Sequence, residues 1–398
     1  GLGGNVMGKK IYMDNSATTP VKQEVLDEML PFFSTKYGNP SSIYSLGSQS
    51  KNAVEISREK VAKALNAKTN EIFFTAGGSE ADNWALKGVA FANRKKGNHI
   101  ITSKIEHHGI LHTCEYLQKQ GFKVTYLDVD EYGIVDLKQL EKAITDETIL
   151  ISIMFANNEI GTIQPIKEIG KIAKDNDIYF HTDAVQAVGH IKIDVDELNI
   201  DLLSLAAHKF YGPKGIGALF IRQGVKIDPL ISGGAQERSR RAGTENVPGI
   251  IGMGKAIEIA YENLDEKNTR LIRLRDRLIN KIFEKIDYVR LNGHPTKRLP
   301  GNVNICFEFI EGESLLLSLD MVGIAGSSGS ACTSGTLEPS HVLLAIGLPH
   351  EIAHGSLRLS LGDFNTEEEV DFVVEKLVEI VARLRSMSPL YENIKEVK

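Results

Sequence analysis

Short apolar runs alternate with amphipathic segments along the chain from about residue 71. The apolar runs lie at 71–75, 99–102, 123–127, 148–155, 178–181, 202–205 and 216–221. Between them, the segments 79–93, 107–120 and 166–175 have the spacing of amphipathic helices. Buried strands that alternate with helices form a largely parallel sheet covered on both faces. The pattern therefore predicts an α/β fold.

The pattern changes after Gly243. We expect a long helical stretch over 249–286, then a strand at 302–308, a helix at 313–319, a glycine- and serine-rich loop at 326–335 and a last helix at 366–386. These elements predict a smaller C-terminal α/β domain, with the long helix as the bridge to it. We place a large domain at 17–262 and the small domain at 263–398, which the N-terminal residues 1–16 join.

Composition narrows the function only slightly. The 398 residues are 42% hydrophobic and 25% charged, which is ordinary for a globular protein, and the net charge of −6 argues mildly against nucleic acid as a partner. No apolar run is long enough to span a membrane. Three cysteines without a CxxC pair suggest a reducing compartment, and with no targeting signal we expect the cytoplasm. We interpret residues 1–6 as additions before a native start at Met7.

A lysine and an acid follow two of the expected strands. Lys209 comes after the run at 202–205 and enters a glycine-rich turn, where an amine can be held desolvated. Asp183 follows the run at 178–181, and Gln186 comes three residues later. This combination suits pyridoxal phosphate (PLP), with a Schiff base on the lysine and the acid paired to the pyridinium nitrogen. The alternative for Asp183 is a cap on the next helix.

Other strand ends carry groups that suit a bound ligand. Gly78 and Ser79 open a helix whose N–H groups could cradle a phosphate, with Ser79 and Asp82 as a pattern like a capping box; the alternative is an ordinary glycine-rich turn. His107 opens the next helix, where it could stack on a flat ring and move protons, or lie on the surface. Asn158 follows the long apolar run, where open α/β sheets bind ligands; the alternative is a turn rich in Asn and Gly.

His108 and His112 are four residues apart, a helical spacing that could suit a metal, but no third ligand is nearby, so a metal site is not favoured. Thr244 lies in a basic turn that could bind an anion or be a solvated surface loop. Arg358 interrupts an apolar alternation, which favours pairing with a substrate carboxylate or with an internal acid. Cys332 lies among small polar residues, which suggests a mobile, exposed and reactive thiol, although a lone loop cysteine is more often inert.

Together these motifs resemble the cysteine desulfurases of the class-V aminotransferase group, PLP enzymes that supply sulfur for iron–sulfur cluster assembly. The resemblance extends over nearly the whole chain, and its most specific stretches are Asp183 with Gln186, 208–215, 241–244 and 327–332. The segment 337–340 after the cysteine is similar to the housekeeping cluster-assembly subgroup. The resemblance implies PLP fold type I, a mainly parallel seven-stranded sheet and a homodimer.

The resemblance also implies a role for each candidate residue. Lys209 would carry PLP and move protons, and Cys332 would be the nucleophile that takes sulfur from L-cysteine, leaving L-alanine and a persulfide. The persulfide sulfur would pass to an iron–sulfur scaffold protein or another acceptor, with Cys332 at most a transient cluster ligand and no stable metal site. Asp183 would pair with the pyridine nitrogen, Gln186 and Asn158 would contact the ring hydroxyl side, and Asn158 would also contact the substrate. His107 would stack on the ring and act as an acid and base, and Arg358 would bind the substrate carboxylate. The phosphate contacts would come from Gly78, Ser79, His208, and Thr244 of the second subunit.

One position departs from the resemblance. Many members have a serine three residues before the lysine, where it contacts the phosphate, and here that residue is Ala206. The loss of a hydrogen bond to a charged group costs roughly 1.5–3 kcal/mol.

The alternatives that stay open are a selenocysteine lyase, another class-V PLP enzyme such as an aminotransferase, or a non-catalytic scaffold with the same fold.

Overall fold

The central element is a seven-stranded sheet in the order β2-β8-β7-β6-β5-β3-β4. The computed structural model describes residues 10–329, 331–333 and 336–397, with side chains in 10–329 and 338–394. The strands of this sheet are β2 (Ile72–Thr75), β3 (His99–Ser103), β4 (Lys123–Leu127), β5 (Thr148–Ser152), β6 (Tyr179–Asp183), β7 (Leu202–Ala206) and β8 (Gly217–Ile221). β8 runs in the opposite direction to the other six strands of this sheet, which are parallel to one another. The mainly parallel seven-stranded α/β fold is therefore confirmed.

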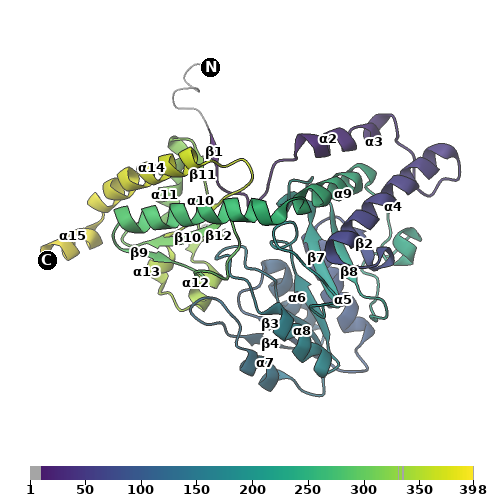
Figure 1. Cartoon of the computed structure of the whole chain (residues 1–398). Helices are drawn as coiled ribbons and strands as arrows, with labels where there is room; N and C mark the ends of the chain where they lie inside the picture. The colour runs from purple at the N-terminus through teal and green to yellow at the C-terminus, as the bar shows by residue number, and fades with distance from the viewer. Residues whose placement is uncertain (1–9, 330, 334–335, 398) are drawn as a thin grey trace.

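Helices cover both faces of this sheet, as Figure 1 shows. Successive strand residues point to opposite faces, so Phe73 of β2 packs with α5 (Gly78–Ala92) and α6 (His108–Lys119), whereas Phe74 packs against the opposite layer. The opposite layer includes α4 (Ser45–Leu65), α8 (Ile166–Asp175) and α9 (Val247–Tyr261). Both faces are apolar because both are buried, which explains the continuous apolar runs in the sequence.

A second core lies in the C-terminal part of the chain. There, an antiparallel sheet has the order β14-β10-β9, and its strands are β9 (Val289–Leu291), β10 (Asn302–Phe307) and β14 (Ser356–Ser360). Its apolar cluster also contains Ile11 and Met13. The strand β1 (Ile11–Tyr12) pairs in parallel with β11 (Ile324–Ala325). Because the two ends of the chain share this core, we propose the division at 17–262 and 263–398 as the domain boundary.

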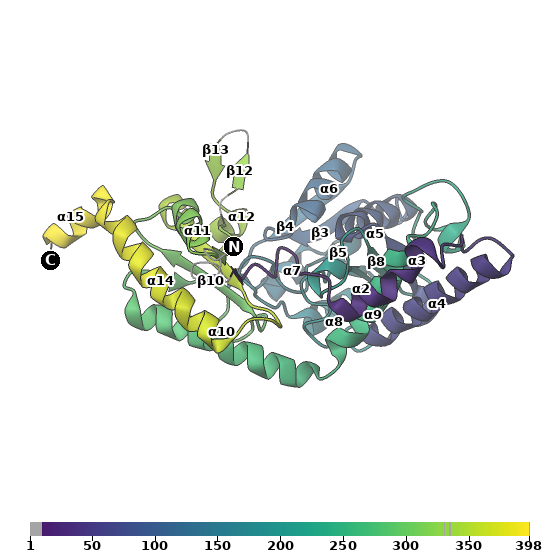
Figure 2. The same ribbon diagram turned by 90° about the horizontal axis from the view of Figure 1, so that it is seen from above.

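The long helix expected over 249–286 is two helices, and that prediction was wrong. Helix α9 ends at Tyr261 and α10 (Leu264–Lys285) begins after Asn263, whose φ of 55° is left-handed. The buried side of α9 packs into the core of the large sheet, whereas that of α10 packs into the C-terminal core. The chain must change direction to serve both cores, and the views in Figures 1 and 2 show α10 leading away from the large sheet. The helix expected over 366–386 is α14 (Glu367–Ser386), which begins with a capping box formed by Thr366 and Glu369. It is not the last helix as expected, because α15 (Pro389–Val397) follows it.

The loop expected over 326–335 is partly a hairpin, which corrects the placement of Cys332. The strands β12 (Ala331–Thr333) and β13 (Thr336–Glu338) pair antiparallel, with Cys332 opposite Leu337 in register. Antiparallel backbone pairing gives these two strands a defined direction, and they stand at the upper edge of the molecule in Figure 2.

The remaining helices are α2 (Gln23–Met29), α3 (Pro31–Ser34), α7 (Leu137–Ala143), α11 (Gly312–Met321), α12 (His341–Ala345), α13 (His350–Ala353) and α15 (Pro389–Val397). Within the described residues, no helix combines the length and apolar character needed to cross a membrane.

Candidate active site

One cavity of about 250 Å³ lies where the carboxyl ends of the central strands meet the start of α5. Open α/β sheets bind their ligands at this edge. Eight of the residues selected from the sequence line it, namely Gly78, Ser79, His107, Asn158, Asp183, Gln186, His208 and Lys209. Asp82, Met154, Val185 and Ala206 complete the lining. The fold therefore brings together residues that are up to 131 positions apart, from Gly78 to Lys209.

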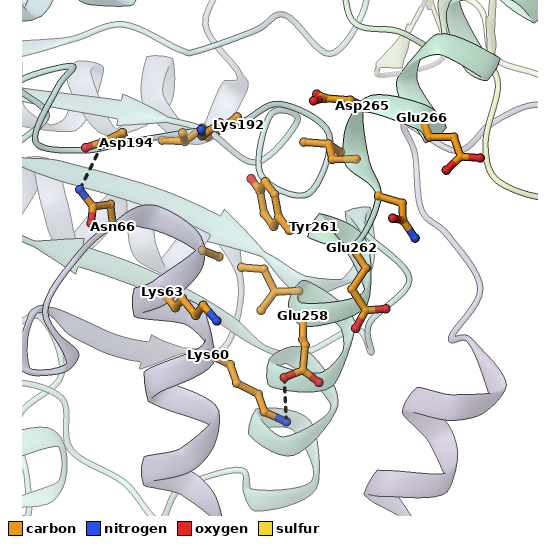
Figure 3. A pocket seen from close by; sticks show the side chains of 15 residues that line it. Lys60, Lys63, Asn66, Lys192, Asp194, Glu258, Tyr261, Glu262, Asp265 and Glu266 are labelled. Carbon is orange, nitrogen blue, oxygen red and sulfur yellow. Dashed lines mark hydrogen bonds and ion pairs between the residues drawn. The ribbon is translucent and has the colours of Figure 1, made fainter.

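A larger hollow of about 1080 Å³ lies elsewhere, between α4, α9 and the start of α10. Its lining carries charges of both signs, as Figure 3 shows, including Lys60, Lys63, Lys192, Glu258 and Glu262. Lys60 and Glu258 already pair with each other at 3.6 Å. None of the residues selected from the sequence lines this hollow, so its size does not make it the site of chemistry.

Lys209 stands at the mouth of the smaller cavity, in a 3₁₀ turn directly after β7. Its ammonium group donates hydrogen bonds to the carbonyl oxygens of Ser16 and Ala17, the latter at 2.9 Å. Burial, and then the positive charge of Arg358, lower the pKa of Lys209 to about 8. A sizeable fraction of this amine is therefore neutral near physiological pH, which is the form that can act as a nucleophile or base.

Asp183 lies at the end of β6 and is 5% exposed. One carboxylate oxygen accepts a hydrogen bond from the Val185 N–H at 3.1 Å, so the acid also stabilises the turn that follows the strand. Gln186 borders the same cavity and donates to the Ser16 carbonyl at 3.0 Å. Turns and not a helix follow β6, so the alternative that Asp183 caps the next helix is wrong, and the acid lies at the cavity wall.

The capping box expected from Ser79 and Asp82 is absent, which corrects that prediction. Helix α5 begins at Gly78 with Gly77 as its N-cap and no side-chain cap. Asp82 is instead 1% exposed, and its carboxylate lies 3.7 Å from the ring Nε2 of His181. Burial, and then the charge of Asp183, raise the pKa of Asp82 well above its usual value. The sequence signal for this was an acid on the same helix face as the buried Ala85 and Leu86, three and four residues further on.

The two histidines at the cavity differ in their surroundings. His107 is the N-cap of α6, and its Nδ1 accepts a hydrogen bond from the Gly109 N–H at 3.0 Å. In the neutral ring the proton is therefore on Nε2. For His208, burial and then the charge of Lys209 lower the pKa to about 4, and its Nδ1 pairs with the Thr18 hydroxyl at 3.0 Å. His208 is thus a neutral hydrogen-bonding group at physiological pH.

Arg358, on β14, reaches this edge from the C-terminal core. Its guanidinium pairs with Asp14 at 3.0 Å and donates to the Asn158 carbonyl at 3.0 Å. The internal salt bridge that the sequence left open is therefore present. Its buried Nε has no hydrogen-bond partner among the described residues, so a donor remains for a ligand.

Thr244 is not among the residues that line the cavity. Thr244 is exposed in the loop before α9. The backbone of Cys332 is on β12, and its side chain lies outside the described residues. His108 and His112 pack edge to face at 5.3 Å between ring centroids, and within the described residues no group of three or more His, Cys, Asp or Glu side chains could hold a metal ion.

The model of the class-V aminotransferases matches residues 11–373 of the chain. A cysteine desulfurase IscS of Clostridium botulinum is 65% identical over 389 residues, which cover 97% of this chain and 98% of that protein. This chain belongs to the class-V aminotransferase family, among its cysteine desulfurases. The resemblance stated from the motifs is therefore confirmed.

Two solved structures agree with this membership. One described as a NifS-like protein is 43% identical, with a TM-score of 0.89 and coverage of 94% of this chain and all of that one. A second, described as SspA in complex with cysteine, is 40% identical, with a TM-score of 0.79 and coverage of 89% of this chain and all of that one. These likenesses confirm fold type I.

The cavity residues fit PLP, the cofactor of this family. Asp183 offers a buried carboxylate for the pyridine nitrogen and Lys209 an amine with a lowered pKa. The start of α5 borders the same space, and its first N–H groups have no partners within the helix, which suits a phosphate. An acid, an amine and an anion site around one cavity match the three polar ends of the cofactor.

Ala206→Ser is expected to tighten PLP binding about tenfold, because a new hydroxyl would donate to the phosphate. Ala206 lines the cavity, and a Cβ placed on Gly78 would lie 3.8 Å from the Ala206 Cβ, so residue 206 faces the helix start. The dissociation constant of PLP from the reconstituted apoprotein measures this effect. Ala207→Ser is the control, since Ala207 lies in the apolar core and should lower stability with no gain in affinity. Equal PLP affinity in Ala206→Ser and the wild type would mean that another donor already serves that phosphate oxygen.

Proposed function

We propose that this protein removes sulfur from L-cysteine with PLP in the cavity at the strand ends, leaving L-alanine and a persulfide on Cys332. The observation that carries the proposal is the convergence of Lys209, Asp183 and the α5 start on one cavity, with Arg358 beside it. The related structure described as a complex with cysteine supports the substrate.

The cofactor would be held by groups on different elements. Asp183 would face the pyridine nitrogen, and Gln186 and Asn158 would contact the ring hydroxyl side, since both line the cavity. Gly78, Ser79 and neutral His208 would donate to the phosphate. His107 would stack on the ring from the N-terminus of α6. When bound, PLP supplies an electron sink that makes the substrate Cα proton acidic.

Lys209 would move protons to and from the substrate. Its pKa of about 8 puts it close to the working pH, where a general acid–base group is most effective. The His107 ring, with its proton on Nε2, is a second donor on the same cavity wall. Arg358 would orient the substrate by pairing with its carboxylate, because it is held beside Asn158 at the cavity.

The sulfur step belongs to Cys332. Its thiolate attacks the sulfur of the substrate, a sulfur–sulfur bond forms, and the Cβ–S bond breaks. The electron pair of the broken bond stays with the three-carbon fragment, which takes up a proton and leaves as L-alanine. Cys332 lies on β12, which pairs with β13. The segment that leads into β12 begins close to Arg358, because Ser327 and Arg358 form a backbone bridge.

A second copy of the chain would complete the phosphate site through Thr244. Thr244 is exposed and does not line the cavity of its own chain, which suits a residue that serves a partner subunit. Large exposed apolar side chains in the 26–44 region support a covered surface there, including Phe33 (61%) and Ile43 (97%). We propose a homodimer on these grounds, with a scaffold protein or another carrier as the sulfur acceptor.

The free thiols of Cys114 and Cys306 are buried and suit a reducing compartment. We therefore propose the cytoplasm as the location. Neither nucleic acid nor a membrane is part of the proposed activity.

The decisive assay incubates the PLP-loaded protein with L-cysteine and measures alanine and sulfide, with and without a thiol reductant. We expect continued alanine release with reductant, sulfide in equal amount, and roughly one alanine per chain without it, because the persulfide then stays on Cys332. Faster alanine release from selenocysteine than from cysteine would instead indicate a lyase. A PLP-loaded protein that forms no alanine would contradict the proposal and favour a scaffold.

A further inference from the structure

Asp14 is a charged residue beside the cavity to which the proposed chemistry gives no role. It follows β1 and forms a backbone bridge with Ser360 at the end of β14. Its carboxylate accepts hydrogen bonds from Arg358 Nη2 at 3.0 Å and from the Ser327 hydroxyl at 2.7 Å. The side chain of Asp14 is 18% exposed and that of Arg358 is 11% exposed, so the pair is largely shielded from solvent.

The two partners of Asp14 are also joined through their backbones. Ser327 N–H donates to the Arg358 carbonyl at 3.0 Å, and Arg358 N–H donates to the Ser327 carbonyl at 2.7 Å. Ser327 lies shortly before β12, which carries Cys332. The Asp14 carboxylate therefore accepts hydrogen bonds from the side chains of both Ser327 and Arg358, the two residues of the backbone bridge that precedes β12.

Arg358 has no other acid among its hydrogen-bonded partners in the described residues. Its remaining contact is with the Asn158 carbonyl, and its buried Nε is unpaired there. Asp14 thus balances the charge of Arg358 directly. A substrate carboxylate that binds Arg358 must share the guanidinium with Asp14, and the two anions repel each other at short range in a poorly solvated site.

We propose that Asp14 is the resident counter-ion of Arg358 and limits how tightly the site holds the carboxylate of substrate and product. This inference rests on the proposed function, which assigns that carboxylate to Arg358. The physical consequence is faster release of L-alanine, which carries the same carboxylate as the substrate. Asp14 would then set the affinity of the site without touching the reacting atoms, as a positioning and charge-balancing residue.

Asp14 also acts on the amine of Lys209. The charged groups that face Lys209 are Arg358, Asp14 and Asp183, with His190 and His208 beside it. Arg358 lowers the pKa of Lys209, and Asp14 and Asp183 raise it. Removing the charge of Asp14 should lower that pKa further below about 8, so the neutral amine persists to lower pH.

The variant Asp14→Asn tests the proposal, because its amide oxygen can still accept from Ser327 and Arg358 while the charge is lost. The probe is methylthiopropionate, which has a carboxylate and a thioether but no amine or thiol, so it cannot react with PLP. We expect its Kd for the PLP-loaded protein, measured by calorimetry, to fall about tenfold. The rate at which the apoprotein reloads PLP should reach half its maximum at lower pH than in the wild type.

Asp363→Asn is the matched control. Asp363 pairs with Lys22 at 2.6 Å and is similarly shielded, but it forms no contact with Arg358. Its variant should change neither the Kd nor the pH profile. A Kd for Asp14→Asn that is unchanged or higher, in a variant with wild-type thermal stability, would overturn the proposal and leave Asp14 as a structural partner.

Arg358→Gln distinguishes the proposed role of Asp14 from the proposal that Arg358 binds the substrate carboxylate. If Arg358→Gln abolishes binding of methylthiopropionate while Asp14→Asn leaves it unchanged, only the role of Asp14 fails. If Arg358→Gln leaves binding unchanged, the assignment of the carboxylate to Arg358 fails, and the role of Asp14 fails with it. If the wild type forms no alanine from L-cysteine but Asp14→Asn binds the probe more tightly, the proposed reaction is contradicted and the role of Asp14 as counter-ion of Arg358 is supported.

Discussion

Cys332→Ala is expected to keep PLP bound and to release almost no alanine or sulfide from L-cysteine. The proposed cofactor contacts come from residues that line the cavity and from Thr244 of a second copy, and none of these contacts is assigned to Cys332. Its thiolate is the proposed sulfur acceptor, and loss of an attacking nucleophile typically costs a factor of about 1,000 or more in turnover. The measurement is alanine and sulfide release beside the PLP absorbance of the same sample.

The other two cysteines provide the control. Burial raises the pKa of Cys114 to about 12 and of Cys306 to about 11, so both thiols are protonated and enclosed at physiological pH. Cys306→Ala should keep its turnover and lose only some stability, because Cys306 packs in an apolar cluster. Normal turnover in Cys332→Ala would remove Cys332 from the mechanism.

Lys209→Ala should give a protein that cannot be linked covalently to PLP and has no measurable turnover. The side chain at 209 is both the proposed attachment point and the proposed proton carrier, and removal of a group with two catalytic roles is expected to cost a factor of about 10,000 or more. Borohydride treatment followed by mass analysis of the peptide tests the attachment, and alanine release tests the proton transfer. The wild type should carry reduced PLP on residue 209.

Lys214→Ala is the control for Lys209→Ala, since Lys214 is exposed in the same glycine-rich turn and does not line the cavity. It should trap PLP and turn over as the wild type does. Because the Lys209 ammonium group also donates to the carbonyl groups of Ser16 and Ala17, the fold of the variant is checked by its thermal melting. Covalent PLP on another lysine of Lys209→Ala would overturn the assignment.

Several parts of the site could be predicted because they depend on short-range pattern and a general property of sheets. The run around Phe73 and Phe74 is apolar at successive positions because both faces of the strand are buried. Carboxyl ends of parallel strands meet at one edge, so Asp183 and Lys209, each just past a strand, could be expected to lie close together. The cavity that both residues line agrees with that expectation.

Other features depend on contacts between distant segments, and local pattern does not report them. Helical periodicity continues through Asn263, yet the chain bends there because α9 and α10 belong to different cores. Asp82 has the spacing of a capping-box partner for Ser79, but Gly77 is the N-cap of α5 and the acid lies beside His181 of the sheet. Cys332 lies among loop-forming residues, and pairing between β12 and β13 places it on a strand.

The sequence by itself determined the α/β class, the order of the strands along the chain and the residues proposed to carry the chemistry, because each of these follows from periodicity or from the identity of a side chain. Tertiary structure alone decided which charges neighbour one another. Asp14 and Arg358 are 344 positions apart, and they pair because both ends of the chain enter one C-terminal core. Electrostatic effects depend on distance and burial, and neither can be read from positions along the chain.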